Sequence, residues 1–307
     1  MSDIIEAYYE KLAAKGARGK MNLPALARRD IPFMECIQSD TGKLFISQDV
    51  VALEPSITAE MSGDWMYRYA TLDSIGKRPF YTDDGVLMID DIYLMSASQF
   101  PTTRNKMRDI YDNHTMPTGL SFADQWMIDS EICKDYTKKT VRNFAKVACL
   151  GIGYGMGYRK FQKTSEEAGV PISVGEAKET IAAYWRLFSG LAALRDTLSW
   201  EVKRKGSLVN PFGYRLTPQP HKALNAYIQS SASGVLDVYI MKLFAMTPYA
   251  EFVCLIHDEV VLQCPENKIK DFEEISRICI ESLNKDLGWD TPIRFGTKIA
   301  TTFAEIK

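Results

Sequence analysis

The sequence predicts an α+β fold, and three observations point to it. Two apolar runs within residues 252–265 flank a short polar stretch, which is typical of an antiparallel hairpin. Helical patterns precede and follow this hairpin, at 221–246 and 267–285. Strands and helices do not alternate along the chain as they do in a parallel βαβ sheet. We therefore expect an antiparallel sheet combined with a mainly helical region.

The remaining elements follow in chain order. Residues 3–15 predict a short amphipathic helix, and a basic, turn-prone stretch follows it. The stretch "KLFISQDVVAL" predicts a strand that ends near Asp49, and Pro55 then lies within the first turn of a helix. The pattern is mixed from 63 to 137. Beyond residue 137, the sequence predicts helix over 138–150 and 164–206, a strand and turn over 207–218, and a final strand over 292–305.

Composition limits the classes of function. A chain of 307 residues with 46% hydrophobic residues can bury a large core, and its length suggests roughly two domains. The formal charge of −2 excludes a strongly basic binder but leaves room for a local basic groove. No apolar run approaches the ~20 residues of a membrane span, and no signal-peptide core is present. We therefore expect no membrane partner and a cytoplasmic location.

Cysteine and histidine usage bears on redox state and metal choice. The six cysteines form no CxxC pair, which favours reduced, buried thiols. Three histidines in the whole chain argue against a zinc site. A metal ion would instead be held by carboxylates, which suits Mg²⁺ or Mn²⁺.

One helical pattern carries cations and an aromatic ring at regular spacing. In "KKTVRNFAKVACLGIGYGMG", four residues follow one another at intervals of four: Arg142, Lys146, Leu150 and Tyr154. On an α-helix they form one gently winding stripe. Two cations with a ring beyond them would suit a nucleoside triphosphate, although an ordinary solvated basic face is an equally good explanation. Alternating glycines over 151–157 predict a flexible end to this helix.

This spacing resembles motif B of the family A DNA polymerases, the group that contains bacterial DNA polymerase I and many phage replicases. In that family the motif is the mobile fingers helix that closes over the incoming dNTP. The resemblance implies that Arg142 and Lys146 hold the triphosphate and that Tyr154 packs near the nascent base pair. Leu150 stands where the family carries Phe or Tyr, which should alter discrimination against dideoxynucleotides.

Upstream, "SQDVVALEP" resembles motif A of the same family. The resemblance implies that Asp49 is a metal ligand with the Val50 carbonyl beside it. It also implies that Glu54 is the steric gate that fills the space of a ribose 2′-hydroxyl. Without the resemblance, Asp49 would be a turn residue at a strand end, and Glu54 an acid favoured by the helix dipole.

Downstream, "LIHDEVV" resembles motif C, which implies that Asp258 is the second metal-binding carboxylate. Two carboxylates from separate strands can hold two divalent ions ~4 Å apart for phosphoryl transfer. The resemblance thus implies nucleotidyl transfer from a dNTP to a primer 3′-hydroxyl with two Mg²⁺ ions, which Mn²⁺ can replace. Glu259 takes a supporting catalytic role, and His257 neighbours the primer strand.

Weaker resemblances add DNA and nucleotide contacts. Asn225 and Gln229 lie four apart on a predicted helix, at the spacing of a family pair that contacts the minor groove, although such side chains are more often simply solvated. Tyr93 stands where a family histidine touches the triphosphate. Lys20, or Arg18 after a two-residue shift, matches a segment that touches the primer.

The resemblance runs from residue 18 to the C-terminus and implies the palm and fingers of a right-hand polymerase, with thumb and exonuclease absent. We expect a first part of the palm over 1–60, expanded fingers over 61–206 and a second part of the palm over 207–307. The primer-template DNA would then be gripped with the help of a second polypeptide that supplies thumb and exonuclease. Such a split polymerase is expected of a bacteriophage and would act in DNA replication in the host cytoplasm.

Three alternatives remain open. The chain could be a segment trimmed from a longer gene product. It could be a catalytically idle replisome subunit that binds DNA or a partner through a polymerase-like palm. His257-Asp258 could instead be the HD pair of a metallophosphohydrolase, although such sites need more histidines than this chain offers.

Overall fold

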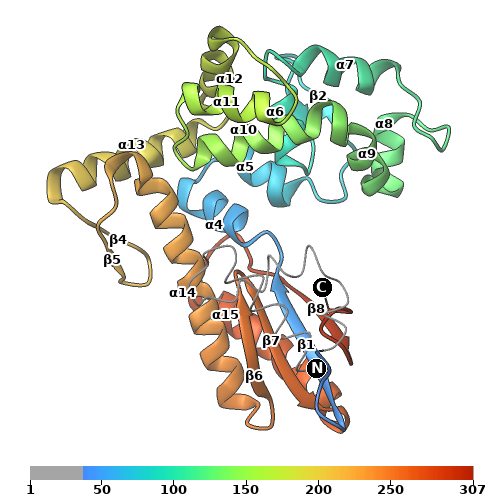
Figure 1. The fold of residues 1–307 in the computed structure, drawn as a ribbon, viewed down its shortest axis with the longest axis vertical. Coiled ribbons are helices and arrows are strands. Elements are labelled where there is room, and N and C mark those ends of the chain that lie inside the picture. The colour runs from blue at the N-terminus through green and yellow to red at the C-terminus, as the bar shows by residue number, and fades with distance from the viewer. Residues whose placement is uncertain (1–36, 307) are drawn as a thin grey trace, which may run out of the picture. The chain divides into compact units, whose positions relative to one another are not determined.

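The structure is a computed structural model that describes residues 37–306. It is an α+β fold, as the sequence predicts, with an antiparallel sheet and a mainly helical region (Figure 1). Contacts divide the chain into two compact units. The first contains the chain up to Leu53, Val235–Gly288 and the stretch from Ile293, and the second contains Glu54–Gly234 and Trp289–Pro292. The predicted palm and fingers boundaries at 60 and 206 stay predictions.

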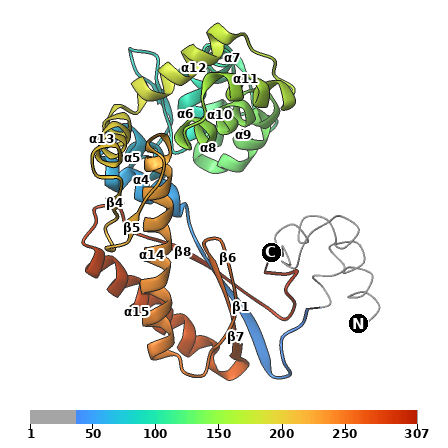
Figure 2. The ribbon, with the colours of Figure 1, turned by 60° about the vertical axis from the view of Figure 1, so that its left-hand side comes forward.

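The first unit, called here the sheet unit, is built on four antiparallel strands in the order β6-β7-β1-β8. Figure 2 shows the blue strand β1 beside the orange and red strands that come from the other end of the chain. The strands are β1 (Lys43–Val50), β6 (Glu251–Ile256), β7 (Glu259–Pro265) and β8 (Phe295–Ala300). The central strands β1 and β7 thus join residues that are more than 200 positions apart.

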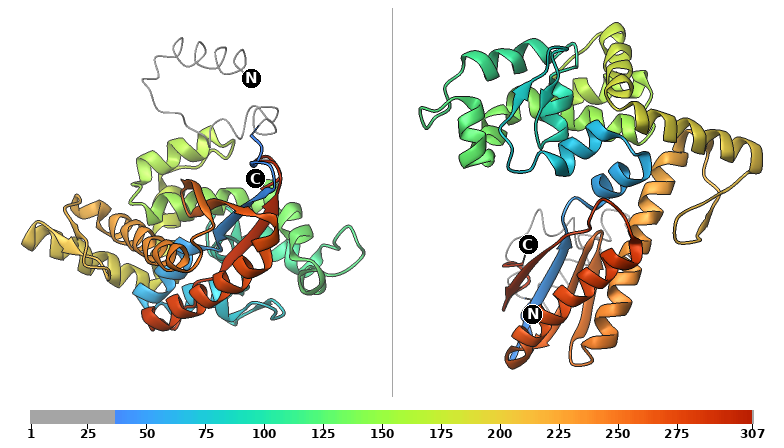
Figure 3. Two further views of the ribbon diagram at one scale, coloured as in Figure 1. Left: turned by 90° about the horizontal axis from the view of Figure 1, so that it is seen from below. Right: turned by 180° about the vertical axis from the view of Figure 1, so that it is seen from behind.

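The two faces of this sheet are covered differently. Ile46, Gln48 and Val50 point to one face, where the C-terminal part of α14 (Ala223–Met246) and α15 (Ile269–Leu287) pack. These helices are joined by an ion pair between Lys242 and Asp286 at 2.6 Å, and they lie together along the sheet (Figures 1 and 3). The hydrophobic cluster on the sheet consists of Phe45, Val261, Phe303 and Ile306.

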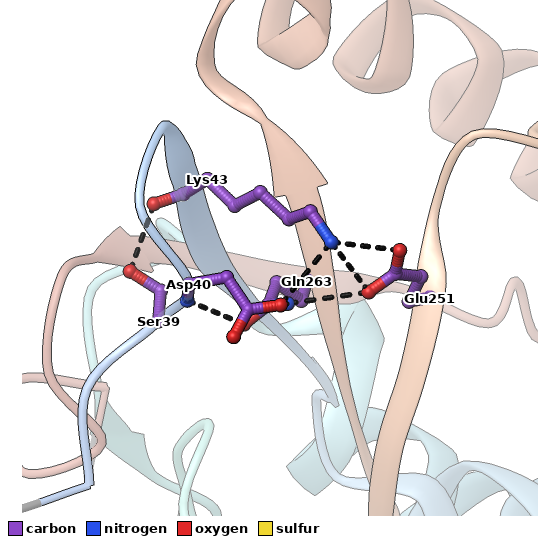
Figure 4. Close-up of polar contacts among 5 residues, drawn as sticks. All are labelled: Ser39, Asp40, Lys43, Glu251 and Gln263. Carbon is purple, nitrogen blue, oxygen red and sulfur yellow. Dashed lines mark hydrogen bonds and ion pairs between the residues drawn. The ribbon is translucent and has the colours of Figure 1, made fainter.

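A polar cluster fixes the register where β1 begins and β7 ends (Figure 4). The Lys43 ammonium donates to both carboxylate oxygens of Glu251, at 2.7 and 2.8 Å, and to Asp40 at 3.2 Å. The Gln263 amide donates to Asp40 at 2.6 Å and accepts from the Asp40 backbone N–H at 3.0 Å. Strands β6, β7 and β1 are therefore tied together by side chains as well as by their ladders.

The second unit, called here the helical unit, consists mainly of short helices. It contains α4 (Leu53–Ser62) from Glu54 onward, the first part of α14 up to Gly234, and the short segment Trp289–Pro292. Its other elements are α5 (Trp65–Arg68), η1 (Tyr69–Asp73), β2 (Phe80–Tyr81), β3 (Leu87–Met88), α6 (Ile92–Ala97), α7 (Arg104–Asn113), α8 (Phe122–Ile128), α9 (Ser130–Thr137), η2 (Lys138–Arg142), α10 (Asn143–Gly153), α11 (Tyr158–Glu167), α12 (Val174–Leu187), α13 (Ser189–Lys205), β4 (Leu208–Val209), β5 (Arg215–Leu216) and η3 (Pro220–Lys222).

Two predicted helices are divided in the structure. The helix expected over 138–150 starts as a π-helical turn, η2, and becomes α-helical only at Asn143. The helix expected over 164–206 is interrupted after α11, because Gly169 is left-handed at φ +82° and ends that helix. Ser173 and Glu176 then form a capping box that starts α12.

Several sequence predictions concern residues outside the described range, namely the helix over 3–15 and the DNA-contacting Arg18 and Lys20. The cysteines at 133, 149, 254, 264 and 279 are free thiols. Within residues 37–306, no helix combines the length and apolar character that crossing a bilayer requires.

Candidate functional site

The sheet unit brings Asp49 next to the turn that carries Asp258. Asp49, near the end of β1, is the register partner of Glu259 at the start of β7. The Val50 N–H donates to the Asp258 carbonyl oxygen at 3.2 Å, which ties the end of β1 to the turn itself. Two acids that lie 209 positions apart in the chain are therefore neighbours at one end of adjacent strands.

A tight turn places Asp258 at the tip of the hairpin. Ile256 pairs with Glu259, so His257 and Asp258 alone connect β6 to β7. His257 adopts a left-handed conformation at φ +57°, which a two-residue hairpin turn commonly requires. Histidine enters this region more readily than most residues other than glycine. The hairpin is therefore made without Gly, Pro or Asn, and its short turn restricts the position of Asp258.

The Glu259 side chain is buried and hydrogen-bonded within the sheet unit. It is a register partner of Asp49 and so lies on the same face as Asp49 and Ser47. Its residue is 9% exposed, and the Ser47 hydroxyl donates to its carboxylate at 2.5 Å. This arrangement suits a supporting acid better than a freely exposed ligand.

Directly before Asp49, a buried polar network anchors strand β1. The Gln48 amide donates to the Ser276 hydroxyl on α15 at 2.6 Å, and the Tyr239 hydroxyl on α14 donates to the Gln48 carbonyl oxygen. The Tyr239 ring also packs on Phe295 of β8, with ring centroids 4.1 Å apart. The backbone of Asp49 is thus held from both helices and from the neighbouring strand.

The donor set at this strand end fits a hard divalent cation. Carboxylate and carbonyl oxygens are the ligands that Mg²⁺ prefers, and it is commonly bound by one or two carboxylates plus substrate phosphates. Across residues 37–306, no group of three or more His, Cys, Asp or Glu side chains is arranged to hold a metal ion. An ion at Asp49 and Asp258 would therefore need oxygens from a substrate or from water.

In the helical unit, the predicted stripe lies along η2 and α10. Lys146, Leu150 and Tyr154 are exposed and Arg142 is half-buried. The opposite side of α10 is packed in the core and contains Phe144, Ala145, Ala148, Cys149 and Ile152. The four residues therefore follow one another from η2 along α10 to its C-cap, and their role stays a prediction.

Arg142 is held by an acid that the sequence interpretation did not include. Its Nε donates to Asp91 at 2.8 Å, and its guanidinium carbon lies 5.1 Å from the centre of the Tyr93 ring. The Lys146 ammonium lies 6.0 Å from the same ring. Burial raises the pKa of Tyr93 to about 12, so its hydroxyl is neutral at physiological pH. The three predicted residues Tyr93, Arg142 and Lys146 therefore form one cluster.

Glu54 and Tyr154 also meet, at the mouth of a small pocket. The Tyr154 hydroxyl donates to a carboxylate oxygen of Glu54. Burial and this hydrogen bond both raise the pKa of Tyr154, so the hydroxyl keeps its proton. The pocket has a volume of about 80 Å³ and is lined mainly by apolar and aromatic side chains, with Tyr93, Leu150 and Asn225 among them. It brings together four of the predicted nucleotide-site residues and one predicted DNA-binding residue.

The glycines after the stripe form a structured helix end. Tyr154 is the C-cap of α10, and Gly155 follows it in the left-handed region at φ +80°. The Met156 N–H donates to the Gly151 carbonyl and the Gly155 N–H to the Ile152 carbonyl, which together make a Schellman motif. The flexibility that the alternating glycines predict for this end stays a prediction.

Asn225 and Gln229 lie on the first turns of α14, in the part that belongs to the helical unit. Gln229 is exposed. The side-chain oxygen of Asn225 is buried and has no hydrogen-bond partner among the described residues. A buried acceptor without a donor lowers the stability of the fold unless a ligand or a water molecule donates to it. Asn225 is therefore a candidate for a contact with a ligand.

The residues that motif matching missed carry local sequence signals of two kinds. Asp91 precedes the apolar stretch Ile92–Met95, which is the pattern of an N-cap before a helix. Ser47 and Gln48 are polar residues within an apolar strand, and buried polar residues need partners. The identities of those partners depend on tertiary contacts that no local pattern contains.

These features define a class of protein: an α+β fold with two acids at adjacent ends of an antiparallel sheet and a separate helical unit with a cationic helix face. The model of DNA polymerase family A matches residues 121–305, more than half of the chain. The chain therefore belongs to DNA polymerase family A, which confirms the resemblance of its motifs.

Individual relatives agree with this assignment. A DNA polymerase of Mycobacterium phage D29 is 29% identical over 278 residues, covering 86% of this chain and 40% of the relative. A DNA polymerase of Escherichia phage T5 is 24% identical and covers 93% of this chain and 33% of the relative. The POL domain of Pol1 from M. smegmatis, solved in complex with DNA primer-template and dNTP, has the same fold, with a TM-score of 0.63 and 15% identity over 94% of this chain and 44% of that chain. The chain thus spans less than half the length of these proteins.

Proposed function

We propose that this chain carries out template-directed DNA synthesis, transferring a nucleotide from a dNTP to a primer 3′-hydroxyl. The observation that carries the proposal is the pairing of Asp49 with the Asp258-Glu259 turn in a member of DNA polymerase family A. A site of this kind acts mainly by positioning charged groups, so a stiff backbone at both acids matters more than an activated side chain. The short turn at His257 and the anchored Gln48 supply that stiffness.

Asp49, Asp258 and the Val50 carbonyl are the proposed metal ligands, with Glu259 in a supporting role. Two Mg²⁺ ions, or Mn²⁺ in their place, would lower the pKa of the primer hydroxyl and neutralise the phosphates when bound. The carboxylates provide the oxygen ligands, and the substrate completes the coordination. Asp49 lies near the end of β1 and Asp258 lies in the turn before β7, so the two acids can approach the reacting phosphate from neighbouring segments.

The helical unit provides the proposed dNTP contacts. Arg142 and Lys146 offer two cations to the triphosphate, and Tyr93, whose ring lies near both, offers a neutral hydroxyl. Glu54 is the proposed steric gate, and its hydrogen bond from Tyr154 fixes the position of its carboxylate. Leu150 lines the pocket with an aliphatic side chain at the position where the family carries Phe or Tyr.

The proposed DNA contacts are Asn225, Gln229 and His257, with Lys20 or Arg18 as a further contact from outside the described range. The unpartnered oxygen of Asn225 supports a contact at that position. We further propose that a second polypeptide acts with this chain and supplies a thumb and an exonuclease. Adding that polypeptide should lengthen the products made per binding event.

Primer extension with Mg²⁺ and each dNTP tests the function. Asp258→Ala should lower incorporation at least about 100-fold while the protein stays folded and binds primer-template. Glu273→Ala is the matched control, because it removes an exposed acid from α15 of the same unit. A wild-type chain that binds DNA but adds no nucleotide, alone or with a partner, would instead indicate an idle replisome subunit. Extension that persists in Asp258→Ala would refute the assigned metal site.

A further inference from the structure

We propose that Asp91 is the positioning residue for Arg142: it orients the guanidinium so that the terminal nitrogens face the triphosphate. The inference rests on the proposed function, since it assigns a role within the same nucleotide site. The Asp91 carboxylate is buried, caps helix α6 with one oxygen and binds Arg142 with the other.

One oxygen of Asp91 starts helix α6. Asp91 has an extended backbone at the N-cap, and its Oδ1 accepts from the backbone N–H groups of Tyr93 and Leu94, both at 2.9 Å. The side chain is 4% exposed, so its position is fixed by its surroundings. The cap also holds the backbone of Tyr93 in the first turn of α6.

The other oxygen of Asp91 holds Arg142. Oδ2 accepts from Nε at 2.8 Å, an atom on the inner side of the guanidinium. Arginine has five N–H donors, and four of them are on the two terminal nitrogens. Among the described residues, these terminal nitrogens have no protein hydrogen-bond partner. Asp91 thus occupies the Nε–H donor and leaves the four N–H donors of the two terminal nitrogens, which can bind a phosphate in a bidentate manner, to a ligand.

Tyr93 limits the remaining freedom of the guanidinium. The guanidinium carbon lies 5.1 Å from the Tyr93 ring centre, within the range of a cation–π contact. A long arginine side chain that is free in solution loses considerable rotamer entropy when a ligand immobilises it. A side chain that is already held by Asp91 and Tyr93 has lost part of that entropy before the ligand binds.

An ordinary helix cap would not need a carboxylate in this place. Ser121 and Ser173 cap α8 and α12 in the same unit with a hydroxyl. Asp129 caps α9 by accepting from the Glu131 N–H, and it is exposed. Asp64 is a buried carboxylate cap of α5, but its second oxygen accepts from the backbone N–H groups of Gly190 and Leu191. Asp91 differs from all of these caps in pairing with a cation. Its second oxygen therefore has a role beyond capping.

The test separates capping from positioning with matched variants. Asp91→Asn keeps a side-chain oxygen for the cap but presents a neutral amide to Arg142, and Asp91→Ser keeps a capping hydroxyl with no reach to the guanidinium. Asp129→Asn is the control, an equivalent change at a cap without an arginine. Binding of dNTP to the protein is measured by the change in melting temperature with nucleotide concentration, and kcat and KM by single-nucleotide primer extension.

We expect both Asp91 variants to weaken dNTP binding and raise KM about 10-fold, the loss of one charge-assisted hydrogen bond, with a smaller change in kcat. Asp129→Asn should change neither. In an Arg142→Ala background, Asp91→Asn should have no further effect on dNTP affinity, because its partner is already gone.

Each other outcome overturns the proposal. Unchanged dNTP affinity in the Asp91 variants would remove the role while leaving the polymerase function intact. An equal loss in the Arg142→Ala background would make Asp91 a cap only, as would failure of both Asp91 variants to fold. A wild-type chain that binds dNTP with the expected Asp91 dependence but never extends a primer would refute the proposed function alone. A wild-type chain that binds no dNTP would refute both.

Discussion

Removing one buried hydroxyl should measurably loosen the strand that ends at Asp49. The change is Tyr239→Phe. The Tyr239 hydroxyl donates to the Gln48 carbonyl oxygen and lies 3.0 Å from the Ser276 hydroxyl, and all three residues are buried. Burial raises the pKa of Tyr239, so the hydroxyl is a neutral donor at any ordinary pH.

The expected loss can be worked out from the partners that remain. Phenylalanine keeps the ring and its packing on Phe295, so no cavity forms. The Gln48 oxygen, however, would be left without its donor at a position that is 1% exposed. Leaving a buried acceptor unsatisfied costs about 1–3 kcal/mol. In a chain of this size each kcal/mol corresponds to a melting-temperature shift of about 2–4 °C.

The assay is urea unfolding followed by far-UV circular dichroism, together with hydrogen exchange of peptides from β1 and β7. All five tryptophans lie in the helical unit, so their fluorescence reports separately on that unit. Tyr249→Phe is the matched control, because the Tyr249 hydroxyl is buried without a hydrogen-bond partner in the described part of the chain. If the two variants lose the same free energy of unfolding, within about 0.5 kcal/mol, the Tyr239 hydroxyl does not stabilise β1.

Three further predictions concern other parts of the chain. Gly155→Ala should destabilise the helical unit by at least about 1–2 kcal/mol, because φ is +80° and the added methyl would lie 2.5 Å from the His221 carbonyl oxygen, whereas Gly157→Ala, with open space around it, should cost under about 1 kcal/mol in the same urea titration. Hydrogen bonds from Lys43 lower the pKa values of Asp40 and Glu251, so the stability they contribute is present above the ordinary carboxylate pKa of about 4 and is lost as pH falls through the lowered values. Lys43→Met should therefore flatten the acid side of the stability profile between pH 3 and 7, and an unchanged slope would contradict the assignment. Glu54→Ala should raise the ribonucleotide-to-deoxynucleotide incorporation ratio at least about 10-fold if Glu54 is the steric gate, and an unchanged ratio would remove that role.

The elements near the proposed site could be predicted because their signals are local. The stretch "KLFISQDV" and the two apolar runs around His257 predict strands by themselves, and the structure confirms both predictions. The spacing of four from Arg142 to Tyr154 likewise predicts one helical stripe, and these residues follow one another from η2 along α10 to its C-cap. The π-helical turn at Lys138–Arg142 was not predictable in the same way, since it adds no residue pattern that differs from an ordinary helix.

The partners of the site residues could not be predicted, because each pairing joins distant segments. Asp91 lies 51 positions from Arg142, and Glu54 lies 100 positions from Tyr154. Sequence patterns predict on which side of a helix or strand a residue lies, but its contact partner depends on how the helices and strands pack. Motif recognition therefore found the residues proposed to touch substrate and missed those that hold them in place.

The difference between Glu259 and Asp258 shows why this second group matters. The two acids are adjacent in sequence, so no sequence pattern separates their environments. Glu259 begins β7 opposite Asp49, is buried and accepts a hydrogen bond from the Ser47 hydroxyl. Asp258 lies in the turn and is less buried. Alternation of side chains along a strand and the left-handed conformation of His257 together produce this difference. The proposed ligand and supporting roles therefore follow from the place of each acid, in the turn or in the strand, and substitutions at His257 should disturb Asp258 more than Glu259.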